Sequence, residues 1–292
     1  MCKKPLVILL FVVLFLPALV FGEYGFTPNI QIDGTGQIGQ MTLTGRSLAY
    51  ANGNIYAAWT DWRNTDFGEK SDTYFAVSTD GGKTFEQSIK VSDNPAGTLR
   101  TSIADIAADK SGQYIYVLYR VTDDESIRLV RSTDGGETFE PSINVEKRGC
   151  RSYYEGWTSM TVDNEGNVYV AWEERGSKGC SKTPGIYMAK STNRGKSFDK
   201  KFLLHNKVHV SIDFTGRLVL ANDVAVDDAG NIYVAWMDDY WPTAKIVVAV
   251  STDGGKSFGH QTVIDSSSIP QSYPQIIARG NGEAWVSWQD GR

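Results

Sequence analysis

Arginine side chains gather on one group of predicted connecting segments in this chain. Eight of its thirteen arginines fall there: Arg46, Arg63, Arg100, Arg120, Arg151, Arg175, Arg217 and Arg292. A guanidinium group grips a planar carboxylate through two parallel hydrogen bonds. Carboxylates lie between these arginines in the sequence, and such groups can act as acid or base or can neutralise the arginines. The connectors therefore predict a site for an acidic ligand, and solvated salt bridges between connectors are the alternative.

A repeated phrase shows which elements must position these connectors. Residues 78–85, 132–139, 191–198 and 251–258 each read S-T-[DN]-x-G-x-[ST]-F, at intervals of 54 to 60 residues. The Asp or Asn can bind nearby backbone N–H groups, and Gly supplies a positive φ. The closing Phe returns the chain to an apolar interior. Each copy therefore predicts a pinned turn, and a fixed period of this length predicts a repeat architecture.

Strand patterns surround every copy of the phrase. Five Gly-containing turns precede runs with a two-residue period: 55–59, 114–119, 168–172, 232–236 and 284–288. A further strand leads into each copy, at residues 73–77, 127–131, 186–190 and 246–250, and another leaves it. Four antiparallel strands per repeat are typical of a propeller blade. We expect an all-β propeller with four full blades and a partial fifth, six-bladed if complete; a sandwich of unrelated hairpins is the alternative.

The two ends of the chain carry separate signals. Residues 1–22 combine Lys3 and Lys4 with an apolar run that ends at Gly22, the pattern of a cleaved signal peptide. We therefore expect a secreted protein with a propeller over residues 23–292, although an uncleaved anchor stays open. The chain stops after a two-stranded hairpin. The ring is thus expected to be completed by missing C-terminal blades or by a second chain, and residues 25–32 could supply one outer strand.

The net charge, the cysteines and the histidines indicate which partners, disulfides and metal sites the sequence allows. The formal net charge of −5 argues against nucleic acid as a partner. An exported protein permits Cys150 and Cys180 to pair, and two free thiols are the alternative. His205 and His209 are four residues apart on a predicted strand or loop, which does not place them on one helical face. No metal site and no cofactor is expected.

The repeated phrases make the chain resemble the sialidase superfamily, in which they are called Asp boxes. In that family they are structural, so Asp80, Asp134, Asn193 and Asp253 are expected to pin turns away from the ligand. The resemblance covers most of residues 45–292 and is closest in the first repeat. There, residues 45–48 stand at the place of an aromatic-Arg-Ile-Pro phrase, without the Ile-Pro, and residues 61–63 match an acid-x-Arg phrase.

The resemblance implies roles for particular residues. Arg46 is implied to clamp the carboxylate of sialic acid, with Arg63 beside it. Asp66, Glu69 or Asp72 is implied as the general acid. In the family a Tyr assisted by a Glu attacks the anomeric carbon. Glu155 with Arg175 resembles the Glu–Arg pair one repeat early, while the last blade, which carries the Tyr, lies beyond this sequence.

Together these features predict an exported propeller that recognises a terminal acidic sugar of a glycan or glycoconjugate. The predicted substrate-binding residues are Arg46, Arg63, Arg100, Arg151, Arg175 and Arg217. If the protein is an enzyme, the resemblance implies an exo-glycosidase of the sialidase type. A non-catalytic module that binds glycan or protein, and a structural spacer without a ligand, are the alternatives.

Overall fold

The computed structural model describes an all-β protein. The described residues are 46–65, 70–147, 158–174, 185–205, 222–238, 244–265, 271–280 and 282–291, with Ile32, Ser267 and Ile269. Within these ranges there is no helix, and hence none that could cross a membrane. Four four-stranded antiparallel sheets and one two-stranded sheet confirm the predicted four full blades and partial fifth. A sixth blade and a closed ring stay predictions.

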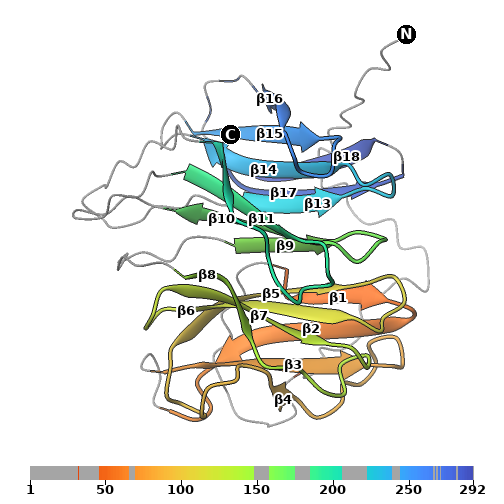
Figure 1. Ribbon diagram of the computed structural model, residues 1–292, viewed down its shortest axis with the longest axis vertical. Helices are drawn as coiled ribbons and strands as arrows, with labels where there is room; N and C mark the ends of the chain where they lie inside the picture. The colour runs from red at the N-terminus through yellow and green to blue at the C-terminus, as the bar shows by residue number, and fades with distance from the viewer. Residues whose placement is uncertain are drawn as a thin grey trace, which may run out of the picture.

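Each sheet is a meander in which consecutive strands pair. Blades 1 and 2 comprise β1 (Leu48–Ala51), β2 (Asn54–Asp61), β3 (Asp72–Ser78), β4 (Ile89–Lys90), β5 (Thr101–Ala108), β6 (Ile115–Val121), β7 (Ser126–Ser132) and β8 (Ile143–Lys147). Blades 3 to 5 comprise β9 (Thr158–Val162), β10 (Val168–Glu174), β11 (Gly185–Ser191), β12 (Phe202–His205), β13 (Asn222–Val226), β14 (Ile232–Asp238), β15 (Lys245–Ser251), β16 (Gly259–Val263), β17 (Gln271–Arg279) and β18 (Glu283–Asp290). In Figure 1 the first two blades fill the lower half of the view, and β9–β18 lie above them.

The first strands of successive blades lie next to one another. Contacts run from β1 to β5, from β5 to β9, from β9 to β13 and from β13 to β17. These strands are therefore the innermost ones. Because the strands alternate in direction, all five inner strands begin at the same end of the molecule, which we call the mouth. The connections that follow the second strands lie at the mouth as well, and the repeated turns lie at the opposite end.

Apolar layers between the blades hold the stack together. Ala58 and Phe75 of blade 1 pack against Ile106 and Val117 of blade 2. Leu118 of blade 2 packs with Val170 and Trp172 of blade 3, and Ala171 of blade 3 packs with Trp236 of blade 4. Because side chains alternate along a strand, each central strand is buried on both faces, which explains its nearly continuous apolar sequence.

The repeated turns are held by one hydrogen-bond pattern. In the first copy, Asp80 Oδ1 accepts from the backbone N–H groups of Lys83 and Thr84, and its Oδ2 accepts from Thr84 Oγ1. Ser78 Oγ donates to Asp80 and accepts from the N–H of Gly82. The turns at Asp134, Asn193 and Asp253 repeat this arrangement. These contacts involve only residues of the turn itself, at the end away from the mouth.

These hydrogen bonds also change how the turn carboxylates titrate. For Asp134, partial burial would raise the pKa, but hydrogen bonds from Ser132 and Thr138 outweigh it and lower the pKa to about 2. Hydrogen bonds likewise lower the pKa values of Asp80 and Asp253. A carboxylate whose pKa is lowered on folding stabilises the fold at pH values above the ordinary carboxylate pKa. This stabilisation is lost as the pH falls toward the lowered pKa. The turns therefore keep their stabilisation in mildly acidic conditions.

Each repeated turn after the first also docks onto the preceding blade through its second glycine position. A Cβ atom at Gly136 would lie 2.6 Å from Phe75, and one at Gly195 would lie 3.1 Å from Tyr116. Gly255 approaches Met188 in the same way. The glycine therefore serves two needs, a positive φ and the close approach of two blades.

The faces of the first and last blades that point away from the other described blades differ from these interfaces. Leu48 and Tyr50 on β1 and Ile277 on β17 are exposed. Ile32 packs on the face of blade 1 that carries Trp59 and Tyr74. The predicted outer strand over residues 25–32 otherwise lies outside the described residues, as does the predicted signal peptide over residues 1–22.

We predict that Gly136→Ala destabilises the fold by about 1–3 kcal/mol more than Gly135→Ala. Both residues have a positive φ, but a Cβ at Gly135 meets nothing closer than 3.5 Å. Arg194, which also has a positive φ, occupies the position of Gly135 in the third turn. Urea unfolding of both variants measures the difference, and equal losses of stability would contradict the docking role.

Candidate functional site

Arg46 occupies the mouth end of the inner strands, where several blades meet. It lies two residues before β1, and its Nη2 donates to Asp223 Oδ2 at 3.0 Å. The same nitrogen reaches the carbonyl oxygens of Val224 at 2.9 Å and Ile276 at 2.7 Å. Arg46 therefore joins the first blade to the fourth and fifth.

The carboxylate of Asp223 fixes this guanidinium. Asp223 Oδ1 accepts from Ser159 Oγ of blade 3 at 2.6 Å, and its Oδ2 accepts from the N–H of Ile276 at 2.8 Å. Asp223 is one residue into β13, so its side chain is set by a buried strand rather than by a loop. Residues of blades 3, 4 and 5 thus fix the Asp223 carboxylate, which in turn binds Arg46.

Asp105 is a second buried carboxyl group in the same region. It follows a bulge in β5, where the pairing with β6 shifts between Ser102 and Asp105. Such bulges re-aim side chains within a strand. The two oxygens of Asp105 accept from the N–H groups of Ile106 and Met160 at 2.8 Å each, which ties blade 2 to blade 3. We call Arg46, Asp105, Ser159 and Asp223 the axial cluster.

Burial and charge shift the proton affinities of this cluster. Burial raises the pKa of Asp105 to about 7, against the opposing charge of Arg46 and with help from Asp223. Burial by itself would lower the pKa of Arg46, but the charges of Asp223 and Asp105 raise it. The guanidinium therefore remains charged, and Asp105 changes its protonation near neutral pH.

Arg46 keeps unused donors for a ligand. Its side chain is 30% exposed, and all of its hydrogen bonds to described residues come from Nη2. The Nε–H and the two Nη1–H groups have no acceptor among those residues. Because a carboxylate, sulfate or phosphate oxygen accepts such hydrogen bonds well, the side chain can bind an anion without giving up Asp223.

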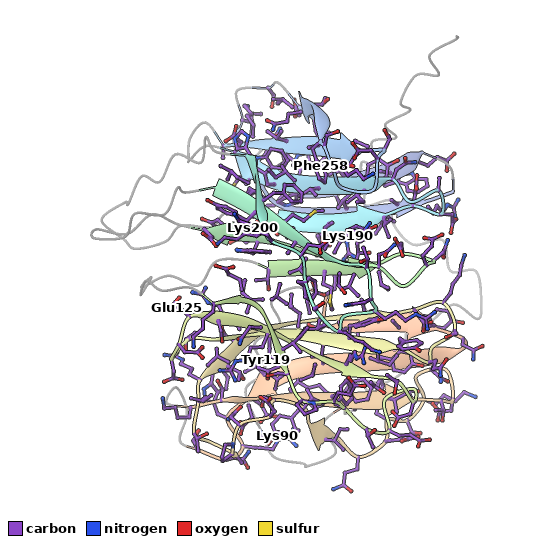
Figure 2. The ribbon with its side chains drawn as sticks, viewed as in Figure 1. Lys90, Tyr119, Glu125, Lys190, Lys200 and Phe258 are labelled. Atoms are coloured by element: carbon purple, nitrogen blue, oxygen red, sulfur yellow. The ribbon has the colours of Figure 1, made fainter. Side chains whose placement is uncertain are left out.

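A second basic group lies between blades 2 and 3 near the mouth. Arg120 at the end of β6 is only 2% exposed and pairs with Glu125 at 2.5 Å, and Figure 2 labels Glu125 at this edge of the molecule. Among the described residues its Nε and Nη1 have no hydrogen-bond partner, and neither do the hydroxyl groups of Ser102 and Thr158. Ser102 pairs with Arg120 across the sheet, and Thr158 lies on the face of β9 that packs on blade 2. Buried polar groups of this kind are places for water or ligand oxygen atoms.

Arg63 and Arg100 lie in other clusters. The Arg63 guanidinium is bound to Asp61, lies 3.8 Å from the centre of the Tyr74 ring and donates to Ser88 Oγ. Arg100 is exposed on the connector between blades 1 and 2, where its N–H donates to Asp123. Among the described predicted arginines, Arg46 is therefore the one in the axial cluster.

Asp72, the described candidate for a general acid, has both oxygens occupied. It is 1% exposed and accepts from Asn64 Nδ2, Asn94 Nδ2 and the N–H of Gly97, and Lys90 lies 3.7 Å away. These contacts tie Asp72 to its own blade and to the connector that follows it, which favours a structural role. The remaining predicted site residues lie outside the described ones: Asp66, Glu69, Cys150, Arg151, Glu155, Arg175, Cys180 and Arg217.

Similarity to known proteins was found only in the fold. No protein-family model matches the chain, and no curated protein sequence matches it. A leech intramolecular trans-sialidase matches with a TM-score of 0.58 and 11% sequence identity, over 87% of this chain and 55% of the leech chain. The chain has a sialidase-like β-propeller fold.

Two further structures share this fold. A protein of unknown function from Dyadobacter fermentans matches with a TM-score of 0.52 and 15% identity, over 79% of this chain and 70% of its own. An ulvan lyase of polysaccharide lyase family PL25 matches with a TM-score of 0.51 and 15% identity, over 82% of this chain and 57% of its own. The chain thus spans between 55% and 70% of these three proteins.

We predict that the raised pKa of Asp105 makes stability fall as the pH rises from about 4 to 8. The folded protein binds more protons than the unfolded chain in this window, so its advantage is full at low pH and is lost as Asp105 ionises. The loss is on the order of 4 kcal/mol for a shift of this size. Asp105→Asn should remove this part of the pH dependence in urea unfolding. An unchanged slope would contradict the assignment.

Proposed function

We propose that this protein binds a terminal acidic sugar of a glycan at the mouth of the propeller, with Arg46 as the anchor of the acidic group. One observation carries the proposal. A charged, partly exposed guanidinium with unused N–H groups stands where the inner strands of blades 1, 4 and 5 meet. Its position is fixed before a ligand arrives, so binding costs little ordering of the protein.

The unpartnered donors of Arg120 support an anionic or hydroxyl-rich ligand at the same end. Sugars offer many oxygen acceptors and hydroxyl donors, which suit both Arg120 and the hydroxyl groups of Ser102 and Thr158. No metal-binding group of three or more His, Cys, Asp or Glu side chains occurs in the described part of the chain. The proposal therefore uses arginine alone as the source of positive charge.

Hydrolysis of the bound sugar is the enzyme form of this proposal, and a binding module is the alternative. A general acid must reach the leaving oxygen atom. Asp72 and Asp105 are almost fully buried, and both oxygens of each accept hydrogen bonds. The described residues therefore favour binding, while catalysis would rest on Asp66, Glu69 or Glu155. The proposal includes export, because residues 1–22 have the pattern of a signal peptide.

We predict that Arg46→Ala weakens the binding of 3′-sialyllactose at least about tenfold, while Arg279→Ala leaves it unchanged. Arg279 is the matched control because it has the same charge and lies over Trp285, at the far end of β17. Isothermal titration measures both affinities, with lactose as the neutral ligand. Equal binding of the two sugars, or full affinity in Arg46→Ala, would contradict the proposal.

A stability control accompanies this measurement, because Arg46→Ala leaves the buried Asp223 carboxylate without its cation. The double variant Arg46→Met, Asp223→Asn removes both charges. It should recover part of the lost stability and still fail to bind. Release of free sialic acid from the same sugar by the pure protein would identify the enzyme form, and saturable binding without product would identify the binding module.

A further inference from the structure

A cavity of about 520 Å³ lies between the outer strands of blades 3 and 4, away from the axial cluster. Leu203, Leu204 and His205 of β12 form one side. Asp238, Val247, Gln261 and Val263 of blade 4 form the other. The cavity therefore combines aliphatic walls with one carboxylate, and no Lys or Arg is among these lining residues.

Blades 1 and 3 fill the corresponding place with a cation of their own. Trp59 Nε1 donates to Asp61, which also binds Arg63 over the ring of Tyr74. Trp172 Nε1 donates to Glu174, which binds Lys201, and the Lys201 Nζ lies 4.8 Å from the centre of the Tyr187 ring. In both blades a Trp, an acid two residues later, a cation and an aromatic ring form one unit.

Blade 4 has the Trp and the acid of this unit, but no Lys or Arg among the described residues forms an ion pair with that acid. Lys245 pairs with Asp238 across the sheet, and its Nζ lies 3.4 Å from the carbonyl oxygen of Ile269 instead. Trp236 and Asp238 occupy the positions of Trp172 and Glu174. Strand pairing gives the other equivalences. In blade 3, Trp172 pairs with Tyr187, which pairs with Leu203. In blade 4, Trp236 pairs with Val247, which pairs with Val263. Val247 thus replaces Tyr187. Gln261, two residues before Val263, replaces Lys201, two residues before Leu203.

The polar atoms around this gap are correspondingly unpartnered. In the part of the chain that the structure describes, the Trp236 Nε1 and the Asp238 Oδ1 have no hydrogen-bond partner. The charged contact of Asp238 within the described residues is with His205 Nε2 at 3.4 Å, and the Asp238 side chain is 29% exposed. A carboxylate beside a cavity, without the cation that two sister blades supply, marks a place for a cation from outside.

We propose that this cavity binds an aliphatic primary ammonium group, either of a free alkylamine or of a lysine side chain. The ammonium would pair with Asp238 at the rim, in the way that Lys201 pairs with Glu174. Its aliphatic stem would lie along Leu203, Val247 and Val263, of which Leu203 and Val263 are 38% and 49% exposed. Burial of those surfaces adds to the affinity.

His205 lies beside the carboxylate of Asp238. Its Nδ1 lies 3.0 Å from Gln261 Oε1, and its ring lies 5.1 Å from that of Trp236. Gln261 donates through Nε2 to the carbonyl of Leu204, so its Oε1 faces the imidazole, which must donate from Nδ1. The Nε2 atom therefore turns a lone pair toward Asp238, and the other groups around the ring are Gln261 and Trp236.

The test uses n-butylammonium as the probe, followed by the methyl signals of Leu203, Val247 and Val263 in NMR spectra of the full chain at mildly alkaline pH. Saturable shifts with n-butylammonium and not with butyrate are expected, with n-butanol at least about tenfold weaker. Nα-acetyl-lysine N-methylamide carries the same group on a peptide backbone. Binding of both amines assigns lysine side chains as well as free amines, and binding of n-butylammonium alone assigns free amines. Binding of neither overturns the proposal.

Three variants make the result specific. Asp238→Asn should weaken the binding of n-butylammonium at least about tenfold, while Glu137→Gln, an exposed acid with the same charge change, should not. Gln261→Lys places in blade 4 the cation that blade 3 has, and should abolish binding while unrelated methyl signals stay in place. Binding by Asp238→Asn or Gln261→Lys with the affinity of the wild-type protein would overturn the proposal.

Discussion

The carboxylate of Asp223 is the constraint on which the mouth of this propeller depends. It accepts hydrogen bonds from Ser159 of blade 3 and from the backbone of blade 5, and it holds the guanidinium that precedes blade 1. A buried carboxylate without such donors would be costly, and a buried guanidinium without an anion would be equally so. Each group therefore depends on the other, and the relative placement of several inner strands depends on both.

The regular part of the fold was predictable because it repeats. Turn residues with fixed backbone requirements recur beside strands with a two-residue period, and the observed strands agree with the predicted ones within a few residues at each end. The hydrogen bonds of the turns at Asp80 and Asp253 follow from the same local rules, since donor and acceptor lie within four residues of each other.

The site was less predictable, because it is made by contacts between distant segments. Arg46 was identified by its place before a strand, but its partners lie 177 and 230 residues away. Asp105 and Ser159 sit inside strands, where a single polar residue gives no sign that it points toward another blade. A carboxylate within the otherwise apolar strand Thr101–Ala108 was the available signal. Arg63 differs from Arg46, because a carboxylate only two residues away binds it locally.

The positions at which one blade departs from the repeat indicate candidate ligand sites, which the regular positions do not. Blades 1, 3 and 4 share a tryptophan and an acid at one position, so the loss of a cation in blade 4 becomes visible only by comparison within the chain. The cavity beside Asp238 arises from two modest replacements, of an aromatic residue by valine and of lysine by glutamine. Internal repeats thus provide a reference state for each blade.

The spacing between Arg46 and Asp223 has a consequence for synthesis of the chain. Ribosomes synthesise a chain from its N-terminus at about 5–20 residues per second. Arg46 is therefore made roughly 10–35 s before its partner Asp223. During that interval blades 1 and 2 can pair their own strands, but the guanidinium of Arg46 does not yet have Asp223 as its partner. The contacts of Arg46 with Asp223, Val224 and Ile276 can therefore form only after blades 4 and 5 have left the ribosome.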